Sequence, residues 1–315
     1  MKELSFPRKQ ESDPRMRGDD ILDRIGNTPL LRLRKIGTEI PGVTLLAKAE
    51  WFNPGGSVKD RAAAGIVAAA EKAGVLTKEK ILLDASSGNT AIAYAMIGAA
   101  KGYKTKLCVP SNASPSVIHS LKSYGAEVVL TSPLESSDGA IREARRLAAE
   151  EPGRYFYADQ YNNPANWQAH YSSTGPEIWE QTGGEITHFV AGLGTTGTLM
   201  GTGRFLKERK PSVQVAAVQP DSPLHGLEGL KQMATSIVPG IYDEQFPNLQ
   251  LEVKTEDAYT MVKRLAREEG LLTGISSGAA LSAGLKLAAL IKNGVMVMIF
   301  PDGGARYLDE EFWKR

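Results

Sequence analysis

The sequence predicts an α/β protein of two doubly wound lobes, each built on a parallel-type sheet covered by helices. Two observations predict this class. Short apolar runs alternate along the chain with longer segments of helical period, and such alternation places successive strands parallel, with helices on both faces of the sheet. The length of 315 residues exceeds that of most single domains, which favours two lobes.

The elements follow from these patterns. The predicted strands are short apolar runs that cover residues 44–50, 81–85, 106–110, 127–131, 187–191, 213–218 and 295–300. The predicted helices have longer, periodic segments and include residues 116–124, 136–150, 165–181 and 256–269. A turn-rich patch, QYNNPAN, begins at Gln160, and turn-forming residues between periodic segments mark loops. We expect the lobes to divide near residues 160–165.

Composition excludes several function classes. The formal net charge is +1 and 42% of the residues are hydrophobic, so neither nucleic acid nor a membrane surface is favoured as a partner. No apolar run approaches the ~20 residues that a bilayer span needs. Residues 1–20 form a polar arm without the apolar core of a signal peptide. We therefore expect a cytoplasmic protein.

Cysteine and histidine usage argues against metal and disulfide chemistry. Cys108 is the single cysteine, which favours a reducing compartment, and its apolar setting predicts a buried, inert thiol. The histidines are scattered without the spacing of metal ligands; they are His119, His170, His188 and His225. We expect no metal site.

A polar loop follows the predicted strand 81–85 and leads into a helix. Its residues are Ser86, Ser87, Gly88, Asn89 and Thr90. Hydroxyl and amide groups beside free backbone N–H groups at a helix start form a cradle for an anion such as a carboxylate. Ordinary N-capping would need only one of these side chains, so the cluster favours a binding site.

A glycine-rich loop follows the predicted strand 187–191. Gly192, Gly194 and Gly197 match the G-x-G-x-x-G pattern of dinucleotide-binding proteins. That fold expects an acidic residue at the end of the next strand, where this chain has Gln219. Three threonines add hydroxyls to the loop: Thr195, Thr196 and Thr198. The loop therefore favours a cup for one phosphate over a dinucleotide track.

Lys59 occupies an unusual position at the entrance of a helix. Ser57 and Asp60 predict a capping-box-like start, which places the lysine in the first turn, where the helix dipole disfavours a cation. We expect its proton affinity to be lowered, as an imine-forming amine requires. Ser276, in a third loop before a helix, supplies a further hydroxyl. An imine-forming lysine and a phosphate cup are parts of a pyridoxal-phosphate site.

These segments together resemble the cysteine synthase and cystathionine β-synthase family of fold-type II pyridoxal-phosphate enzymes, which share a tryptophan synthase β-like fold. The resemblance covers nearly the whole chain after about residue 20. Its motifs, in the family's order, are IGNTPLLRL (25–33), NPGGSVKDR (53–61), SSGNT (86–90), DQYNNPANWQAHYSSTGPEIW (159–179), GLGTTGTLMG (192–201), GISSGAA (274–280) and FPDGGARYL (300–308).

The resemblance implies roles for single residues. Lys59 would be the Schiff-base lysine, Asn89 would hydrogen-bond the ring hydroxyl of the cofactor, and Ser276 would face its pyridine nitrogen. The phosphate would be held by Gly194, Thr195, Thr196, Gly197 and Thr198. The substrate carboxylate would be held by Ser86, Ser87, Asn89, Thr90 and Gln160. The family usually has threonine at the position of Ser86, and serine keeps the hydroxyl.

The resemblance also implies a reaction. A hydroxyl rather than a carboxylate at Ser276 leaves the ring nitrogen largely unprotonated, so β-elimination is favoured over a long-lived carbanion. We expect L-cysteine to be made by β-replacement on O-acetylserine or O-phosphoserine, through an aminoacrylate to which sulfide or another sulfur donor adds. Lys231 would meet a phosphoryl leaving group. The family branch that uses O-phosphoserine and a sulfur-carrier protein has arginine at this position, so lysine keeps the positive charge but departs from that pattern.

Alternatives stay open at this point. Cystathionine synthesis from serine or O-acetylserine and homocysteine is the main one, a nicotinamide-dependent oxidoreductase rests only on the glycine pattern, and an inactive binding partner is the third. The resemblance implies a homodimer. It also implies a larger cofactor-phosphate domain of residues 21–50 and 164–315, and a smaller mobile domain of residues 51–163 that carries Lys59 and the carboxylate loop.

Overall fold

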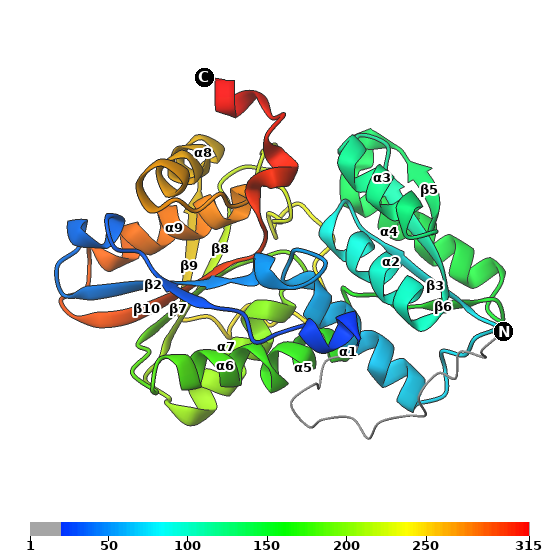
Figure 1. The fold of residues 1–315 in the computed structure, drawn as a ribbon, viewed down its shortest axis with the longest axis horizontal. Helices are drawn as coiled ribbons and strands as arrows, with labels where there is room; N and C mark the ends of the chain where they lie inside the picture. Colours follow the sequence, from blue (N-terminus) through cyan, green and yellow to red (C-terminus); the bar gives the residue numbers. More distant parts are fainter. Residues whose placement is uncertain (1–19, 315) are drawn as a thin grey trace, which may run out of the picture.

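The structure, a computed structural model, describes residues 20–314, apart from the side chain of Ser136. The predicted arm at residues 1–20 therefore lies almost wholly outside the described residues. Two sheets form the frame, side by side in Figure 1. The strands of residues 30–49 and 188–300 form one sheet, and those of residues 81–157 form the other. The domain boundaries and the mobility of the smaller domain stay predictions.

The larger sheet has six strands, and all neighbours are parallel except β1 and β2. In spatial order they are β1 (Leu30–Arg32), β2 (Val43–Ala49), β10 (Gly294–Phe300), β7 (His188–Gly192), β8 (Gln214–Pro220) and β9 (Leu249–Val253). Side chains of β10 alternate between two cores: Met296 and Met298 face one side of the sheet, and Val297 and Ile299 face the other. Both faces are therefore buried, as expected of a parallel sheet.

Helices cover both faces of this sheet. On one side pack α8 (Thr255–Arg264) and α9 (Ile275–Ala288), and on the other pack α6 (Thr174–Gln181) and α7 (Gly197–Arg209). The neighbouring α5 (Pro164–Ser172) lies against both α7 and α1 (Lys59–Lys72). A π-helical turn, Leu265–Glu269, extends α8. The doubly wound arrangement predicted for this lobe is confirmed.

The smaller sheet has four parallel strands in the order β5 (Glu127–Thr131), β4 (Lys104–Pro110), β3 (Ile81–Ala85) and β6 (Tyr155–Tyr157). One face is covered by α1, α2 (Asn89–Lys101) and α3 (Pro115–Ser123), and the other by α4 (Ser136–Glu150). Cys108 lies on β4 and is buried, and burial raises the pKa of its thiol to about 12. The predicted burial of the thiol is confirmed, and its inertness stays a prediction.

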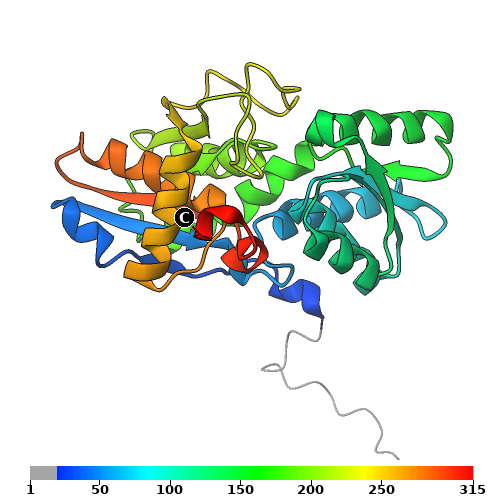
Figure 2. The same cartoon turned by 90° about the horizontal axis from the view of Figure 1, so that it is seen from above.

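Single-turn 3-10 helices punctuate the chain; they are Ile21–Arg24, Ile36–Glu39, Glu50–Phe52, Pro133–Glu135, Gly304–Tyr307 and Glu311–Lys314. The segment between β8 and β9, drawn in yellow in Figure 2, extends from the larger sheet toward the other lobe. Two contacts fix it there: Ile237 N donates to Asp138 Oδ2 at 3.0 Å, and Gly240 N donates to Asn162 Oδ1 at 3.0 Å. These two hydrogen bonds thus join the two lobes.

The structure corrects the predicted elements in two ways. The segment 165–181 is two helices, α5 and α6, because the backbone leaves helical geometry at Ser173 (φ −129°, ψ −69°). Three strands were not predicted: β1 and β6 have only three residues each, and β9 alternates between exposed and buried positions instead of forming an apolar run. All seven predicted strands are present within two residues of their expected bounds.

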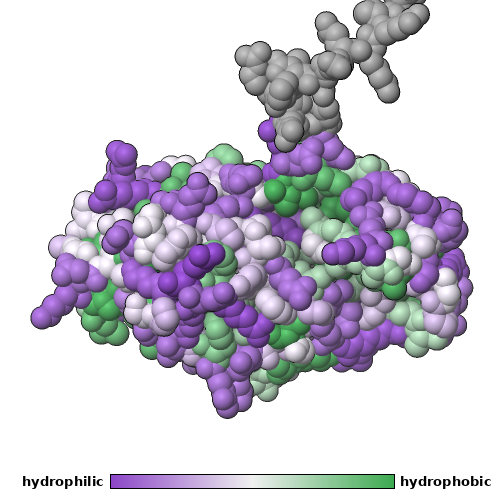
Figure 3. All heavy atoms as spheres, turned by 90° about the horizontal axis from the view of Figure 1, so that it is seen from below, coloured by the Kyte–Doolittle hydropathy of each residue, from purple (hydrophilic) through white to green (hydrophobic). Residues whose placement is uncertain are grey.

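The face of the molecule in Figure 3 is predominantly polar. In Figure 3, hydrophilic side chains cover most of the face seen from below, and hydrophobic ones form scattered patches. Within residues 20–314, no helix has both the length and the apolar character needed to cross a bilayer.

Candidate active site

A cavity of about 640 Å³ is lined by loops from both lobes. Nine of the thirteen predicted site residues line it: Lys59, Ser86, Ser87, Asn89, Thr90, Gln160, Gly194, Thr195 and Lys231. The remaining four, which are Thr196, Gly197, Thr198 and Ser276, are not part of its wall, although each lies within three residues of a lining residue. The carboxyl ends of β3 and β7 lead into two of the lining loops, as expected for ligand sites in parallel sheets.

Lys59 is the first residue of α1 and is partly exposed to the cavity. Burial lowers its pKa, and the negative charge of Asp302 opposes that shift. The direction agrees with the prediction, and loss of hydration is its largest cause. The predicted capping box is wrong: Asp60 accepts a hydrogen bond from Gly55 N at 2.6 Å, and Lys59 N itself donates to Ser57 Oγ at 3.2 Å.

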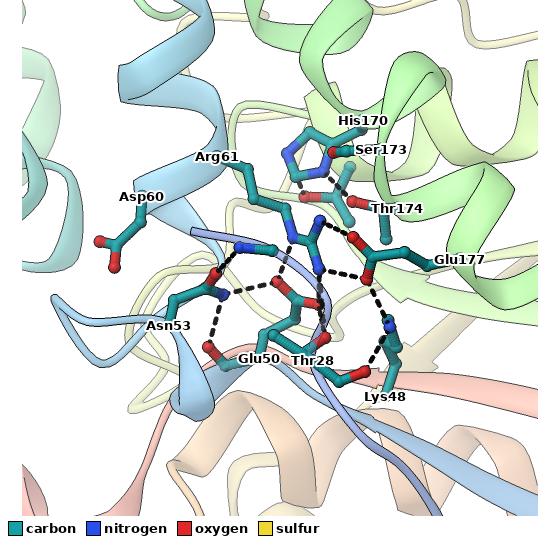
Figure 4. A network of polar contacts seen from close by, with 12 residues as sticks. Thr28, Lys48, Glu50, Asn53, Asp60, Arg61, His170, Ser173, Thr174 and Glu177 are labelled. Atoms are coloured by element: carbon teal, nitrogen blue, oxygen red, sulfur yellow. Dashed lines mark hydrogen bonds and ion pairs between the residues drawn. The ribbon is translucent and has the colours of Figure 1, made fainter. Parts of the chain in front are cut away.

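A buried network of ion pairs anchors the helix that carries Lys59 (Figure 4). Arg61, two residues further along α1, lies between two carboxylates. Its Nε donates to Glu50 at 2.7 Å, and its Nη1 donates to Glu177 at 2.7 Å. Lys48 donates to Glu177 at 2.7 Å, and Thr28 Oγ1 donates to Glu50 at 2.7 Å. Two cations and two anions balance each other where β2, α1 and α6 meet.

The electrostatics of this network agree with its geometry. Burial disfavours the charged form of Glu177, yet the hydrogen bonds and charges of Arg61 and Lys48 lower its pKa to about 2. Glu177 therefore stays ionised at neutral pH. Sequence reasoning quoted the segment that holds Glu177 only as a family motif and gave it no role. Glu177 and its partner Arg61 lie 116 positions apart in the chain.

The polar loop after β3 forms the N-terminus of α2. Gly88 is the N-cap residue and no side chain caps the helix, so the plain-capping alternative for this cluster is not what the structure contains. Ser86 Oγ instead accepts from Gly88 N at 3.1 Å, and Thr90 Oγ1 donates to Gln160 Oε1 at 2.8 Å. The uncapped helix start suits an anion.

Asn89 is held by residues that sequence reasoning did not single out. Its Nδ2 donates to Asp302 Oδ2 at 2.7 Å, and Arg306 donates to its Oδ1. The same Asp302 oxygen accepts from Tyr307 at 2.6 Å, while burial raises the pKa of Asp302. All three of these residues, Asp302, Arg306 and Tyr307, belong to the motif FPDGGARYL. The loop after β10 therefore joins the lysine helix and the carboxylate loop.

The glycine-rich loop leads from β7 to α7, whose N-cap residue is Thr196. Thr196 has a positive φ of 70°, and no side chain caps the helix. Its Oγ1 is buried without a hydrogen-bond partner among the described residues. A Cβ at Gly194 would lie 2.4 Å from the carbonyl oxygen of Gly229, so only glycine fits this close approach. An uncapped helix start with a free hydroxyl is suited to a phosphate.

The threonines beside this helix start have distinct partners. Thr195 Oγ1 accepts from Asn166 Nδ2 at 3.0 Å, and Thr198 Oγ1 lies 3.3 Å from His170 Nε2. Burial lowers the pKa of His170 well below its ordinary value, and the charges of Arg61 and Lys59 add to this. His170 is therefore neutral, which leaves Thr198 beside an uncharged imidazole rather than a cation.

Ser276 is the second residue of α9 and is nearly buried. The turn before it is fixed to the loop after β10, because Gly274 N donates to the Asp302 carbonyl at 3.0 Å. That same loop accepts from Val58 N, next to Lys59, through Pro301 O at 2.8 Å. The segments that hold Ser276 and Lys59 are therefore both attached to the loop after β10. The three segments are distant from one another in the sequence.

Lys231 lines the cavity and is buried, and it is already paired with a carboxylate. Its Nζ lies 2.7 Å from Asp138 Oδ1 and 5.1 Å from the centre of the Tyr161 ring. Asp138 belongs to α4 of the smaller sheet's helical layer. The lysine thus connects the two lobes, which the sequence did not predict. Among the described residues no group of side chains is suited to bind a metal ion.

Comparison with known proteins identifies the family. The model of the pyridoxal-phosphate dependent enzymes matches residues 21–302. The chain belongs to this family. It is 51% identical over 296 residues to a cysteine synthase of Aquifex aeolicus, covering 92% of this chain and 90% of the relative. It is 44% identical to cysteine synthase B of Pseudomonas aeruginosa, covering 91% and 95% of the two chains.

A solved structure also matches this chain over its whole length. The cysteine synthase of Entamoeba histolytica superposes with a TM-score of 0.89 at 37% identity, covering 100% of this chain and 94% of that one. The fold-type II assignment is thereby confirmed, and pyridoxal phosphate is the cofactor. This cofactor replaces the dinucleotide interpretation of the glycine-rich loop.

The residues present fit this cofactor. An amine with a lowered pKa, at Lys59, is suited to imine formation. The uncapped start of α7, with the unpartnered hydroxyl of Thr196, is suited to a phosphate. Which atoms contact the cofactor, including the assignments of Asn89, Gly197, Thr198 and Ser276, stays a prediction.

Proposed function

We propose that this protein is a cysteine synthase that makes L-cysteine by β-replacement on an O-activated L-serine. The observation that carries the proposal is the single cavity shared by Lys59, the uncapped carboxylate loop and the glycine-rich loop. The similarity to cysteine synthases at 51% and 44% identity supports the same reaction. Bound pyridoxal phosphate supplies an electrophilic carbon and withdraws electrons from Cα.

The residues of the chain divide the remaining work. Ser86, Ser87 and Thr90, with the N–H groups of α2, bind and orient the substrate carboxylate. Lys59, whose pKa is lowered by burial, is the base that removes the Cα proton. Ser276 offers a hydroxyl without a negative charge, so it does not stabilise a positive charge at the ring nitrogen.

Two further groups position this machinery. The Arg61 network fixes the helix of Lys59, and Asp302 holds the amide of Asn89 from the opposite side. The segment between β8 and β9 lines the cavity from the larger lobe. We propose that the domain of residues 51–163 closes on the bound carboxylate, and that Gln160, held by Thr90 and the Ala85 carbonyl, moves with it.

Product analysis tests the function. The holoenzyme is given O-acetylserine, O-phosphoserine or serine, each with sulfide or homocysteine, and the products are identified. Cysteine from an O-activated serine and sulfide is the expected product, and it should be lost in Lys59→Ala. Cystathionine as the main product would overturn the proposal in favour of the homocysteine-using alternative.

The choice of leaving group rests on Lys231. We propose that its ammonium receives the phosphoryl group of O-phosphoserine, displacing Asp138. Lys231→Ala should then lower kcat/KM for O-phosphoserine more than for O-acetylserine, and equal values in the parent and the variant would refute this role.

A homodimer, a cytoplasmic location and a sulfur-carrier donor are also proposals. Sedimentation measures the first, fractionation of cells the second, and replacement of sulfide by a carrier thiocarboxylate tests the third.

A further inference from the structure

Glu228 is a charged residue of the cavity wall that the proposed reaction does not use. It lies on the segment between β8 and β9, three residues before Lys231, and both residues line the cavity. Lys231 is paired with Asp138 at 2.7 Å. Glu228, by contrast, forms no ion pair and accepts no hydrogen bond within residues 20–314. As a residue Glu228 is partly accessible to solvent, and it lines the cavity together with groups that displace water from its carboxylate.

The carboxylate of Glu228 lies opposite the start of α2. A Cβ built at Gly88 would be 3.4 Å from Glu228 Oε1. Gly88 is the N-cap residue of α2, so the larger lobe places an anion next to the loop at which we expect the substrate carboxylate to bind. The substrate and Glu228 would then both bring negative charge to one helix start.

The groups that face Glu228 do not neutralise it. Asp302, from the loop after β10, and Glu310, from the C-terminal segment, both disfavour its ionised form, and Arg306 favours it. Tyr307, beside Arg306, interacts with the same carboxylate and is uncharged at neutral pH. Loss of hydration is the largest influence, and together these effects raise the pKa of Glu228 to about 7. Arg306 is thus the one cation named among these groups, and the acidic groups are Asp302, Glu310 and Glu228 itself.

We propose that Glu228 is a specificity-determining residue, whose ionised carboxylate repels the negatively charged groups of amino-acid substrates at the start of α2, so that these substrates bind with uptake of a proton. This inference rests on the proposed function for the position of the substrate carboxylate. Two like charges near one helix start repel each other strongly inside a protein. Binding is therefore tightest when Glu228 is protonated, and the penalty grows with the number of negative charges on the substrate.

The first experiment measures proton uptake without turnover. L-Alanine, which lacks a leaving group, is titrated into the holoenzyme by calorimetry in two buffers of different ionisation enthalpy, between pH 5 and 8. The control variant is Glu244→Gln, which makes the same substitution on the same segment but outside the cavity wall. We expect the parent and Glu244→Gln to take up a fraction of a proton more than Glu228→Gln.

Affinity should follow the same pattern. If binding requires the protonated form, the dissociation constant of L-alanine for the parent rises up to about tenfold more between pH 6 and 8 than it does for Glu228→Gln, for a group with a pKa near 7. Glu228→Asp should keep the pH dependence, because the charge is retained. Equal proton uptake and equal pH dependence in the parent and Glu228→Gln would overturn the proposal.

The second experiment measures specificity. Glu228→Gln should raise kcat/KM for O-phosphoserine several-fold relative to O-acetylserine, because the phosphoryl group adds negative charge. An unchanged ratio would overturn the specificity role. The two proposals fail differently: if neither substrate yields cysteine, the proposed function is wrong, while the alanine titration still decides whether Glu228 controls anion binding.

Discussion

Replacing Arg61 by methionine should destabilise the fold by about 3–5 kcal/mol, the cost typical of removing one partner from a buried ion pair. Arg61 is 3% exposed and Glu50 is fully buried. Methionine keeps most of the apolar stem, so lost packing contributes little. The substitution leaves Glu50 with hydrogen bonds from Thr28 and Asn53 but without its cation. Glu177 keeps Lys48.

Urea unfolding at pH 7 measures the change, provided that the slope with denaturant is the same for parent and variant. The matched control is Arg146→Met. Arg146 also pairs with two carboxylates, Glu143 and Glu150, but on the exposed surface of α4, where such pairs contribute about 0–1 kcal/mol. Adding Glu50→Gln to Arg61→Met should recover part of the loss, because no unpaired charge remains. A cost for Arg61→Met no larger than that for Arg146→Met would refute the reasoning.

Two further predictions concern titratable groups. Asp302→Asn should move the pH midpoint for reductive trapping of pyridoxal phosphate on Lys59 of the apoprotein to lower pH, because the Asp302 charge favours the protonated amine; an unmoved midpoint would mean that Asp302 carries no charge there. Cys108, whose thiol pKa is raised to about 12 by burial, should react with a thiol reagent at least about 100-fold faster after unfolding in urea than in the folded protein. Equal rates would contradict its burial.

The sequence predicted the parts of the site that follow strand ends. Lys59, the loop at residues 86–90 and the glycine-rich loop each sit where an apolar run meets a helix, and this position is visible in a linear pattern. The short edge strands escaped because two of them hold three residues and the third, β9, is half exposed. A period-based method needs longer runs to detect a strand.

The supporting residues could not be predicted in the same way. Glu177 contacts Arg61 across 116 positions of the chain, and Asp302 contacts Asn89 across 213. No local periodicity encodes such a pairing. The sequence also missed the largest cause of the lowered pKa of Lys59, because the burial of an amine depends on the whole fold. The sequence thus identified candidate functional residues, but it did not reveal the residues that surround them in the fold.

Glu228 and Lys231 are the charged residues of the segment between β8 and β9 that line the cavity, and in their proposed roles they link leaving-group recognition to contact between the lobes. A phosphoryl group that binds Lys231 has to displace Asp138, since the pair lies at 2.7 Å. The other oxygen of Asp138 accepts from Ile237 N at 3.0 Å, so its displacement also loosens the segment from α4. A neutral acetyl group imposes no such exchange and encounters less repulsion from Glu228. If Lys231 and Glu228 act as proposed, the acetyl ester is the easier substrate, and use of the phosphate ester requires the segment to move.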